Sequence, residues 1–137
     1  MLDILTLHHV SLPVSDVARA KRFYSDVLGL QEIPRPPFSF EGAWYQLGDR
    51  HLHLIKGANA TFRDGKPIDS QDLHFAIRVS SYRQALEYLT SKGYREDAAD
   101  TDLLKLKANP KATAGFPQIY ILDPDCNVVE INAASLD

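Results

Sequence analysis

Two stretches of this 137-residue chain follow the same pattern, and this internal repeat constrains the fold more than any other feature. Aligning His9 with His74 places Val14 on Val79 without a gap, and the match continues through the helix-like segment behind them. A repeat of this length is typical of one supersecondary unit used twice. The sequence therefore predicts two copies of one unit.

The first copy begins with alternating apolar residues and continues with apolar residues spaced three and four apart. These periods are typical of a half-buried strand and of an amphipathic helix. Gly29 suits the left-handed position that ends a helix. The predicted elements are a strand at 6–14, a helix capped by Ser15 or Asp16 and ending near 28, a short strand at 30–33, and a hairpin at 44–55.

The second copy repeats this order after a Gly-, Asn-, Asp- and Pro-rich stretch at 57–71 that is predicted to be a linker. Its predicted elements are a strand at 73–79, a helix capped by Ser80 or Ser81 and ending near Gly93, a strand beginning at 94–96, a polar loop at 97–114, and a closing hairpin at 120–132. Each copy therefore has the order βαβββ, which is an α+β class. We expect one domain, 1–137, with modules at 5–56 and 72–133.

Composition excludes several classes of protein. A formal net charge of −3 and a pI near 5.9 argue against nucleic acid or an anionic membrane as the main partner. The single cysteine, Cys126, excludes an intrachain disulfide and a cysteine metal cluster. No segment approaches the roughly 20 apolar residues of a membrane helix, and no signal peptide is evident. We expect a cytoplasmic protein.

Each copy places one metal-ligand residue on its first strand and one on its last. The repeat matches His9 with His74, Tyr45 with Tyr120 and, after a second turn that is two residues longer, His53 with Glu130. Alternation along each strand directs the four ligand-type side chains away from the apolar face that packs on the helix. Three imidazoles and one carboxylate suit one divalent ion of the Zn²⁺, Ni²⁺, Co²⁺, Fe²⁺ or Mn²⁺ kind, and not Ca²⁺.

Two further histidines compete for these positions. His8 adjoins His9 but points to the other face of the strand. His51 shares a face with His53, so alternation cannot separate the two, and only the match with Glu130 favours His53.

The motifs His-Val-Ser-Leu-Pro-Val-Ser-Asp at 9–16 and Leu-Asp-Pro-Asp-Cys-Asn-Val-Val-Glu-Ile at 122–131 resemble the vicinal oxygen chelate superfamily. That superfamily holds glyoxalase I, methylmalonyl-CoA epimerase, extradiol dioxygenases, and fosfomycin and bleomycin resistance proteins. The resemblance implies two βαβββ modules that form a cupped, mostly antiparallel mixed sheet around one divalent metal. It implies His9, His53, His74 and Glu130 as ligands, and pairing into a homodimer. Cys126 stands where the family commonly has glycine.

The leading function is a metal-dependent lyase or isomerase of the glyoxalase I type, acting on a small oxygenated carbonyl compound or its thiol adduct. Four protein ligands leave two positions on an octahedral ion for adjacent substrate oxygens, and Glu130 is the expected base. Tyr120, which shares a face with Gln118, is expected to line the pocket, with plain core packing as the alternative. Five basic residues could meet an anionic substrate: Arg35, Arg78, Lys105, Lys107 and Lys111.

Three other functions compete with this one. His9, His74 and Glu130 alone would form the triad of a non-haem Fe(II) dioxygenase, but a fourth ligand at His53 would occupy a position that catechol and oxygen need. A thiol transferase of the fosfomycin resistance kind would need a basic pocket. A binding protein of the bleomycin resistance kind needs no metal ligands.

Overall fold

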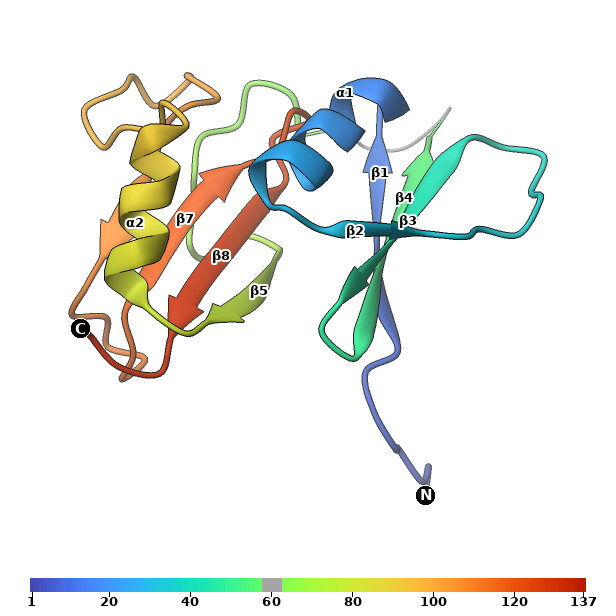
Figure 1. Ribbon diagram of the computed structural model, residues 1–137, viewed down its shortest axis with the longest axis horizontal. Coiled ribbons are helices and arrows are strands. Elements are labelled where there is room, and N and C mark those ends of the chain that lie inside the picture. Colours follow the sequence, from blue (N-terminus) through green and yellow to red (C-terminus); the bar gives the residue numbers. More distant parts are fainter. Residues whose placement is uncertain (58–62) are drawn as a thin grey trace. The chain divides into compact units, whose positions relative to one another are not determined.

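The repeat is present as two four-stranded sheets with equivalent strand orders, β1-β4-β3-β2 and β5-β8-β7-β6 (Figure 1). The computed structural model describes residues 1–57 and 63–137. The chain divides into two compact units, 1–62 and 63–137, and each is described by itself. Tandem βαβββ order and the α+β class are confirmed.

The first unit contains β1 (His9–Val14), α1 (Val17–Lys21), a π-helical segment η1 (Arg22–Val27), β2 (Gln31–Ile33), β3 (Gly42–Leu47) and β4 (Arg50–Lys56). β1 and β4 are parallel, whereas β2, β3 and β4 pair antiparallel. A parallel pair needs a long crossover between its strands, and the helix, β2 and β3 supply it.

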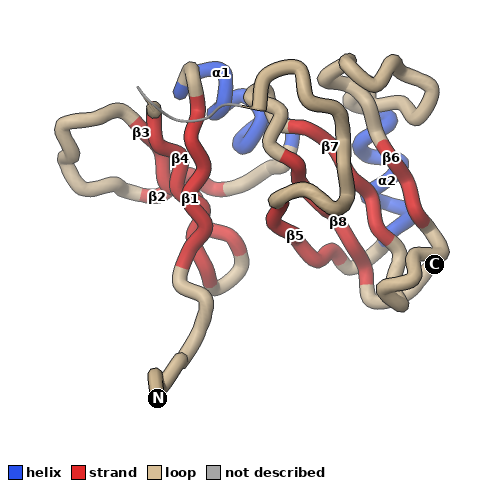
Figure 2. Tube along the Cα trace, turned by 180° about the vertical axis from the view of Figure 1, so that it is seen from behind, coloured by secondary structure: helices blue, strands red, loops and turns tan. Residues whose placement is uncertain are grey.

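The second unit contains β5 (His74–Val79), α2 (Tyr82–Ser91), β6 (Lys107–Asn109), β7 (Gln118–Leu122) and β8 (Val128–Ala133). β5 and β8 are parallel, and β6, β7 and β8 pair antiparallel. Figure 2 shows α2, in blue, on one face of this sheet.

In each unit one sheet face packs against the helix and forms the core. α1 packs on β3 and β4, and α2 packs on β8. The fully buried side chains of the first unit include Tyr24, Tyr45, Leu52 and Leu54, and those of the second include Leu89, Ile119, Ile121 and Val129. Because strand side chains alternate, the intervening residues lie on the opposite face, which we call the open face of each unit.

The predicted helix ends agree with the structure. Asp16 caps α1 by accepting a hydrogen bond from the Arg19 amide, and Ser81 caps α2 by accepting one from the Gln84 amide. The first helix continues as η1, where the Leu28 amide donates to the Phe23 carbonyl five residues back. Apolar spacing does not distinguish this wider turn from an α-helix, because both bury a stripe of similar period.

One strand prediction was wrong. The segment 94–96 forms only a single bridge, between Arg95 and Lys105, and no strand. The strand at this place in the repeat is β6, which falls inside the predicted polar loop 97–114. β6 is a three-residue edge strand of sequence Lys-Ala-Asn, so it carries no hydrophobic alternation that could reveal it.

The predicted linker 57–71 lies partly outside the described residues, which exclude 58–62. Its described part, 63–71, contains turns and no helix or strand. Among the described residues, no helix is long and apolar enough to cross a membrane.

Candidate metal centre

The open face of the first unit carries its candidate ligands. Pairing of β1 with β4 places His9 beside His51 and Ser11 beside His53. On the other side of β4, Trp44 of β3 pairs with His53. Both candidate histidines of β4 therefore lie on the same face as His9, as alternation predicts.

The His53 ring is held between two neighbouring rings. It stacks on Trp44 with centroids 4.0 Å apart and planes 4° apart, and on His9 at 4.2 Å and 22°. His53 is 7% exposed, and its Nε2 atom is buried without a hydrogen-bond partner among the described residues. Burial, together with the charges of the nearby His9, His51, His8 and Arg35, lowers the pKa of His53 to about 4. A neutral imidazole with an unbonded nitrogen is the form that binds a metal.

The other two histidines of this unit lie close to the same rings. His8 precedes β1, and a hydrogen bond of 2.8 Å joins the Nδ1 atoms of His8 and His9. This bond leaves the Nε2 atom of His9 for another partner. The Nδ1 atom of His51 is also buried without a partner among the described residues, so His51 and His53 share this property.

The strand register distinguishes His51 from His53. In the first unit, Ser11, two residues after His9, pairs with His53. In the second, Ala76, two residues after His74, pairs with Glu130. His53 and Glu130 therefore occupy equivalent places in their sheets, and His51 does not share that place.

The same register corrects the match between the two hairpins. Trp44 pairs with His53, and Tyr120 pairs with Glu130, so Trp44 and Tyr120 are equivalent. The sequence match of Tyr45 with Tyr120 was wrong by one residue. Tyr45 lies in the core, whereas Tyr120 lies on the open face beside Glu130.

Glu130 is 4% exposed, and hydrogen bonds hold its carboxylate. Its Oε1 atom accepts from Gln118 Nε2 at 3.1 Å and from Asn132 Nδ2 at 2.8 Å. Its Oε2 atom lies 3.1 Å from His74 Nε2. One carboxylate oxygen is thus occupied by protein donors, and the other faces the histidine.

A backbone carbonyl fixes the protonation of the His74 ring. His74 Nδ1 lies 2.7 Å from the Asp72 carbonyl oxygen, which can only accept, so Nδ1 carries the hydrogen. In the neutral ring, Nε2 then presents a lone pair toward Glu130 Oε2. Two acceptors face each other at 3.1 Å, an arrangement that requires a second proton or a cation.

This pair fits a metal ion. Two neighbouring ligands of an octahedral ion with bonds of about 2.1 Å lie about 3 Å apart. The separation of 3.1 Å between His74 Nε2 and Glu130 Oε2 agrees with that spacing. Donation of the remote ring nitrogen to a carbonyl is also the usual support of a metal-binding histidine.

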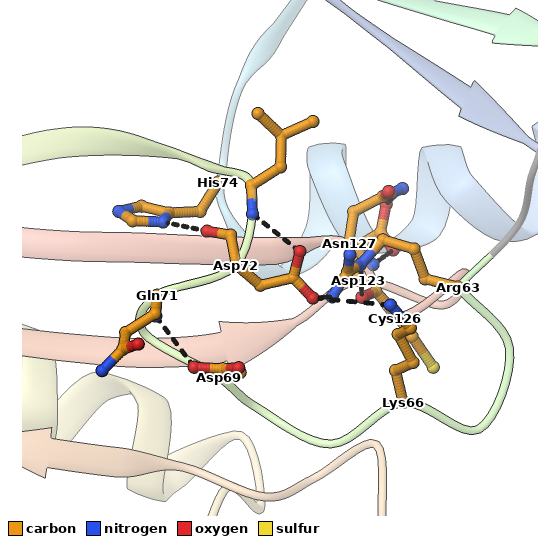
Figure 3. Close-up of polar contacts among 10 residues, drawn as sticks. Arg63, Lys66, Asp69, Gln71, Asp72, His74, Asp123, Cys126 and Asn127 are labelled. Atoms are coloured by element: carbon orange, nitrogen blue, oxygen red, sulfur yellow. Dashed lines mark hydrogen bonds and ion pairs between the residues drawn. The ribbon is translucent and has the colours of Figure 1, made fainter.

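A half-buried ion pair supports the Asp72 carbonyl that orients His74 (Figure 3). The Arg63 guanidinium pairs with the Asp72 carboxylate, and Arg63 Nε donates to the Cys126 carbonyl at 3.0 Å. Arg63 therefore ties the segment before β5 to the turn between β7 and β8. Hydrogen bonds from Arg63 and from the Leu73 amide lower the pKa of Asp72 to about 2.

Tyr120 stands edge-on to His74, with ring centroids 5.9 Å apart. Burial raises the pKa of the Tyr120 hydroxyl, and the charge of Glu130 and a hydrogen bond to it raise the pKa further. Tyr120 also packs with Leu122 and Val128. The protonated hydroxyl lies where it can donate to Glu130.

The turn before β8 positions Glu130. Asp123 Oδ1 accepts from the amides of Asp125 and Asn127, and Asp123 Oδ2 accepts from Asn127 Nδ2. Cys126 has φ +62, the left-handed value expected where the family has glycine. The hydrogen bonds of Asp123 hold this conformation at a residue for which it costs about 1–2 kcal/mol.

Each unit thus brings together one predicted pair, His9 with His53 and His74 with Glu130. Within either unit, the described residues contain no group of three or more histidine, cysteine, aspartate or glutamate side chains that could hold a metal. Sequence reasoning missed Trp44, Arg63 and Asn132. Alternation could have found Asn132, which lies two residues after Glu130 on the same face, but Arg63 lies in a segment with no period.

Comparison with known proteins finds relatives that match nearly the whole chain. The family model described as "Glyoxalase/Bleomycin resistance protein/Dioxygenase superfamily" matches residues 6–131. An uncharacterised protein, YwkD, from Bacillus subtilis (strain 168) is 26% identical over 125 residues, which cover 88% of this chain and 90% of that protein.

Solved structures share the fold. A glyoxalase family protein from Bacillus anthracis has a TM-score of 0.76 at 19% identity, covering 97% of this chain and 98% of that one. Lactoylglutathione lyase from Agrobacterium tumefaciens has a TM-score of 0.68 at 16% identity, covering 96% of each chain. A variant of the fosfomycin resistance protein FosX from Listeria monocytogenes has a TM-score of 0.67 at 17% identity, covering 99% and 95%. That protein was crystallised with Mn(II) and 1S,2S-dihydroxypropylphosphonic acid.

Proposed function

Because this chain belongs to the glyoxalase/bleomycin resistance protein/dioxygenase superfamily, we propose that it is a divalent-metal-dependent lyase or isomerase of the glyoxalase I type. Its substrate is a small oxygenated carbonyl compound or the thiol adduct of one. The observation that carries the proposal is the His74–Glu130 pair, in which a lone pair and a carboxylate oxygen face each other at 3.1 Å.

The proposed ligands are His9 and His53 from the first unit and His74 and Glu130 from the second. The unbonded Nε2 of His53 and its low pKa support a neutral ligand nitrogen there. Imidazole and carboxylate donors suit Zn²⁺, Ni²⁺, Co²⁺, Fe²⁺ or Mn²⁺. When bound, the metal supplies a Lewis acid that polarises the substrate carbonyl.

The side chains of this chain then position and move one proton. Glu130 removes the proton from the carbon beside the carbonyl and returns it. Gln118 and Asn132 hold Glu130 Oε1, so the carboxylate keeps one orientation while Oε2 faces the reacting groups. Tyr120 stabilises the Glu130 charge from the same face.

Two measurements test this proposal. Elemental analysis after reconstitution should find about one divalent ion per chain, and His74→Ala should lose it. If wild-type protein takes up neither Zn²⁺, Ni²⁺ nor Fe²⁺ from excess, the metal centre is wrong.

The second measurement follows the proton. Wild-type protein should exchange solvent deuterium into the carbon beside the carbonyl, and Glu130→Gln should slow turnover by roughly 10²–10⁴-fold. Full activity of Glu130→Gln would remove Glu130 from the mechanism. A catechol panel run with Fe²⁺ tests the alternative, since a dioxygenase would consume oxygen and need no such exchange.

A further inference from the structure

Arg78 lies at one end of the open face of the second unit. It pairs across the sheet with Asn132, and Asn132 pairs on its other side with Gln118. Glu130 is two residues before Asn132 and therefore points to the same face. A cationic side chain thus stands beside the carboxylate and shares its sheet face.

The guanidinium of Arg78 is held in place although the residue is exposed. Its Nε atom donates to Asn132 Oδ1 at 2.7 Å, and its central carbon lies 4.8 Å from the centroid of the Phe116 ring. A freely solvated arginine loses side-chain entropy when it binds a ligand. The contacts of Arg78 already restrict its side chain, so the entropy that it loses on binding is smaller.

Asn132 connects Arg78 to Glu130. Its amide oxygen accepts from Arg78, and its amide nitrogen donates to Glu130 Oε1 at 2.8 Å. The donor on one side fixes the orientation of the amide, so its nitrogen faces Glu130. Hydrogen bonds in such a chain polarise one another. An anion bound at Arg78 therefore changes the strength of the hydrogen bond that Glu130 accepts from Asn132.

The outer edge of Arg78 has no acidic partner in the part of the chain that the structure describes. Neither terminal nitrogen forms an ion pair or a hydrogen bond with any residue that the structure describes. Three other arginines of this unit pair with carboxylates: Arg63 with Asp72, Arg83 with Glu87, and Arg95 with Asp97. Two parallel N–H groups on a fixed guanidinium match the oxygens of a carboxylate, phosphate or phosphonate.

We propose that Arg78 binds an oxyanion group of the substrate, so that the enzyme acts on carbonyl compounds that carry a carboxylate, a phosphate or a phosphonate. The inference rests on the proposed function, because it names the substrate class of the same site. Arg78 contacts the distant anionic group, and Asn132 lies between Arg78 and Glu130.

The first test uses metal-free protein and two small anions, one inorganic and one a carboxylate. Titration with phosphate, and separately with acetate, is followed by the nitrogen–proton signals of Arg78 Nε and Asn132 Nδ2. Both signals should shift in a saturable way with one shared dissociation constant, while Arg95 Nε should not follow that curve. Absence of a saturable shift at Asn132 would overturn the inference, whatever the fate of the metal centre.

The second test uses zinc-loaded protein and three hydroxamates that offer the same pair of vicinal oxygens. Acetohydroxamate is neutral, succinic monohydroxamate carries a carboxylate, and phosphonoacetohydroxamate carries a phosphonate. Calorimetry should show the anionic compounds binding roughly tenfold more tightly than acetohydroxamate, the effect of one exposed charge-assisted contact. The preferred anion identifies the substrate group.

Variants separate binding from support of Glu130. Arg78→Gln should abolish the roughly tenfold preference and leave acetohydroxamate affinity within about twofold. Arg95→Gln, the matched exposed control, should keep the preference. If Arg78→Gln weakened all three compounds equally, Arg78 would be a structural support only, and the inference would be wrong. If wild-type protein bound none of them, the proposed metal centre would fail, and the anion titration would decide the role of Arg78.

Discussion

At the residue scale, Tyr94 has a buried hydroxyl that makes the stability of the folded protein depend on pH in the alkaline range. It is 4% exposed, and burial together with the Asp123 charge raises its pKa to about 12. In an unfolded chain the hydroxyl ionises near pH 10. Between these values the unfolded chain releases a proton that the folded chain keeps. The free energy of unfolding therefore falls as pH rises from about 10 to about 12.

Tyr94→Phe removes this ionisation. The variant should lose less stability than the wild type across that alkaline range, by up to about 2–3 kcal/mol, because one pKa unit corresponds to about 1.4 kcal/mol. Urea unfolding at several pH values checks it. Because every other tyrosine is unchanged, the difference between the two proteins isolates Tyr94. Parallel curves would show that the Tyr94 ionisation does not differ between folded and unfolded chains.

Strand alternation could predict which side chains share a face, and this holds for His9, His53, His74 and Glu130. It could not predict the hydrogen bonds that prepare them. His74 Nδ1 donates to the Asp72 carbonyl, and Arg63 holds the segment that contains Asp72. That segment has no hydrophobic period that could predict its position. The ligand set itself stays a prediction, carried by the repeat and the family resemblance.

At the scale of elements, the end of α2 shows how one glycine sets a helix boundary. The Tyr94 amide donates to the Leu89 carbonyl, and the Gly93 amide donates to the Thr90 carbonyl. These two bonds form a Schellman motif around Gly93, whose φ is +96. A Cβ on Gly93 would lie 3.7 Å from Leu104 Cδ1, an ordinary contact. The position therefore restricts backbone conformation rather than space.

Gly93→Ala should destabilise the protein by about 1–2 kcal/mol, the cost of a left-handed alanine. Gly93→Asn is the matched control and should cost less, because asparagine tolerates this conformation. Thermal unfolding of both variants measures the difference. Equal stability of the alanine variant and the wild type would mean that the helix end rearranges without cost.

Elements with a strong period were predictable, and those without one were not. The hairpin of β7 and β8 carries alternation and a Pro-Asp turn, so its place was predicted. β6 depends on pairing with β7, a tertiary contact that its three polar and small residues do not encode. In the π-helical turn the Leu28 amide donates to a carbonyl five residues back instead of four, and apolar spacing cannot specify that choice.

At the scale of the whole molecule, exposed apolar residues precede the first sheet. Leu2, Ile4, Leu5 and Leu7 are 66–87% exposed. Each sheet also has two edge strands, β1 and β2 in one and β5 and β6 in the other. Exposed apolar side chains and open edges are features that proteins usually cover with a partner.

We expect a homodimer that buries this N-terminal segment. Sedimentation at micromolar concentration should show twice the 15.4 kDa chain mass, and Leu5→Glu with Leu7→Glu should shift the protein toward monomer. Arg83→Glu, which changes an exposed helix position, is the control. A wild-type particle of 15.4 kDa would contradict the expectation.

The repeat made the architecture predictable, because two copies of one sequence pattern are expected to have the same order of elements and to form similar sheets. Both sheets place the first strand beside the last, in parallel. The repeat could not fix details that differ between copies. The hairpin turn is one residue longer in the second copy. The sequence match aligned Tyr120 with Tyr45, whereas the strand register makes Tyr120 equivalent to Trp44.

Trp44 is the single tryptophan of the chain, and its indole lies 4.0 Å from the ring of His53. All tryptophan fluorescence therefore originates beside one candidate ligand. An imidazole in van der Waals contact withdraws excited-state charge from an indole more strongly when it binds a cation. Zinc, which neither absorbs visible light nor changes oxidation state, should quench the emission as it fills the centre. His53→Ala should abolish the quenching, and a spectrum unchanged by saturating zinc would place the metal elsewhere. We therefore expect Trp44 to act as an intrinsic optical reporter of metal binding at His53.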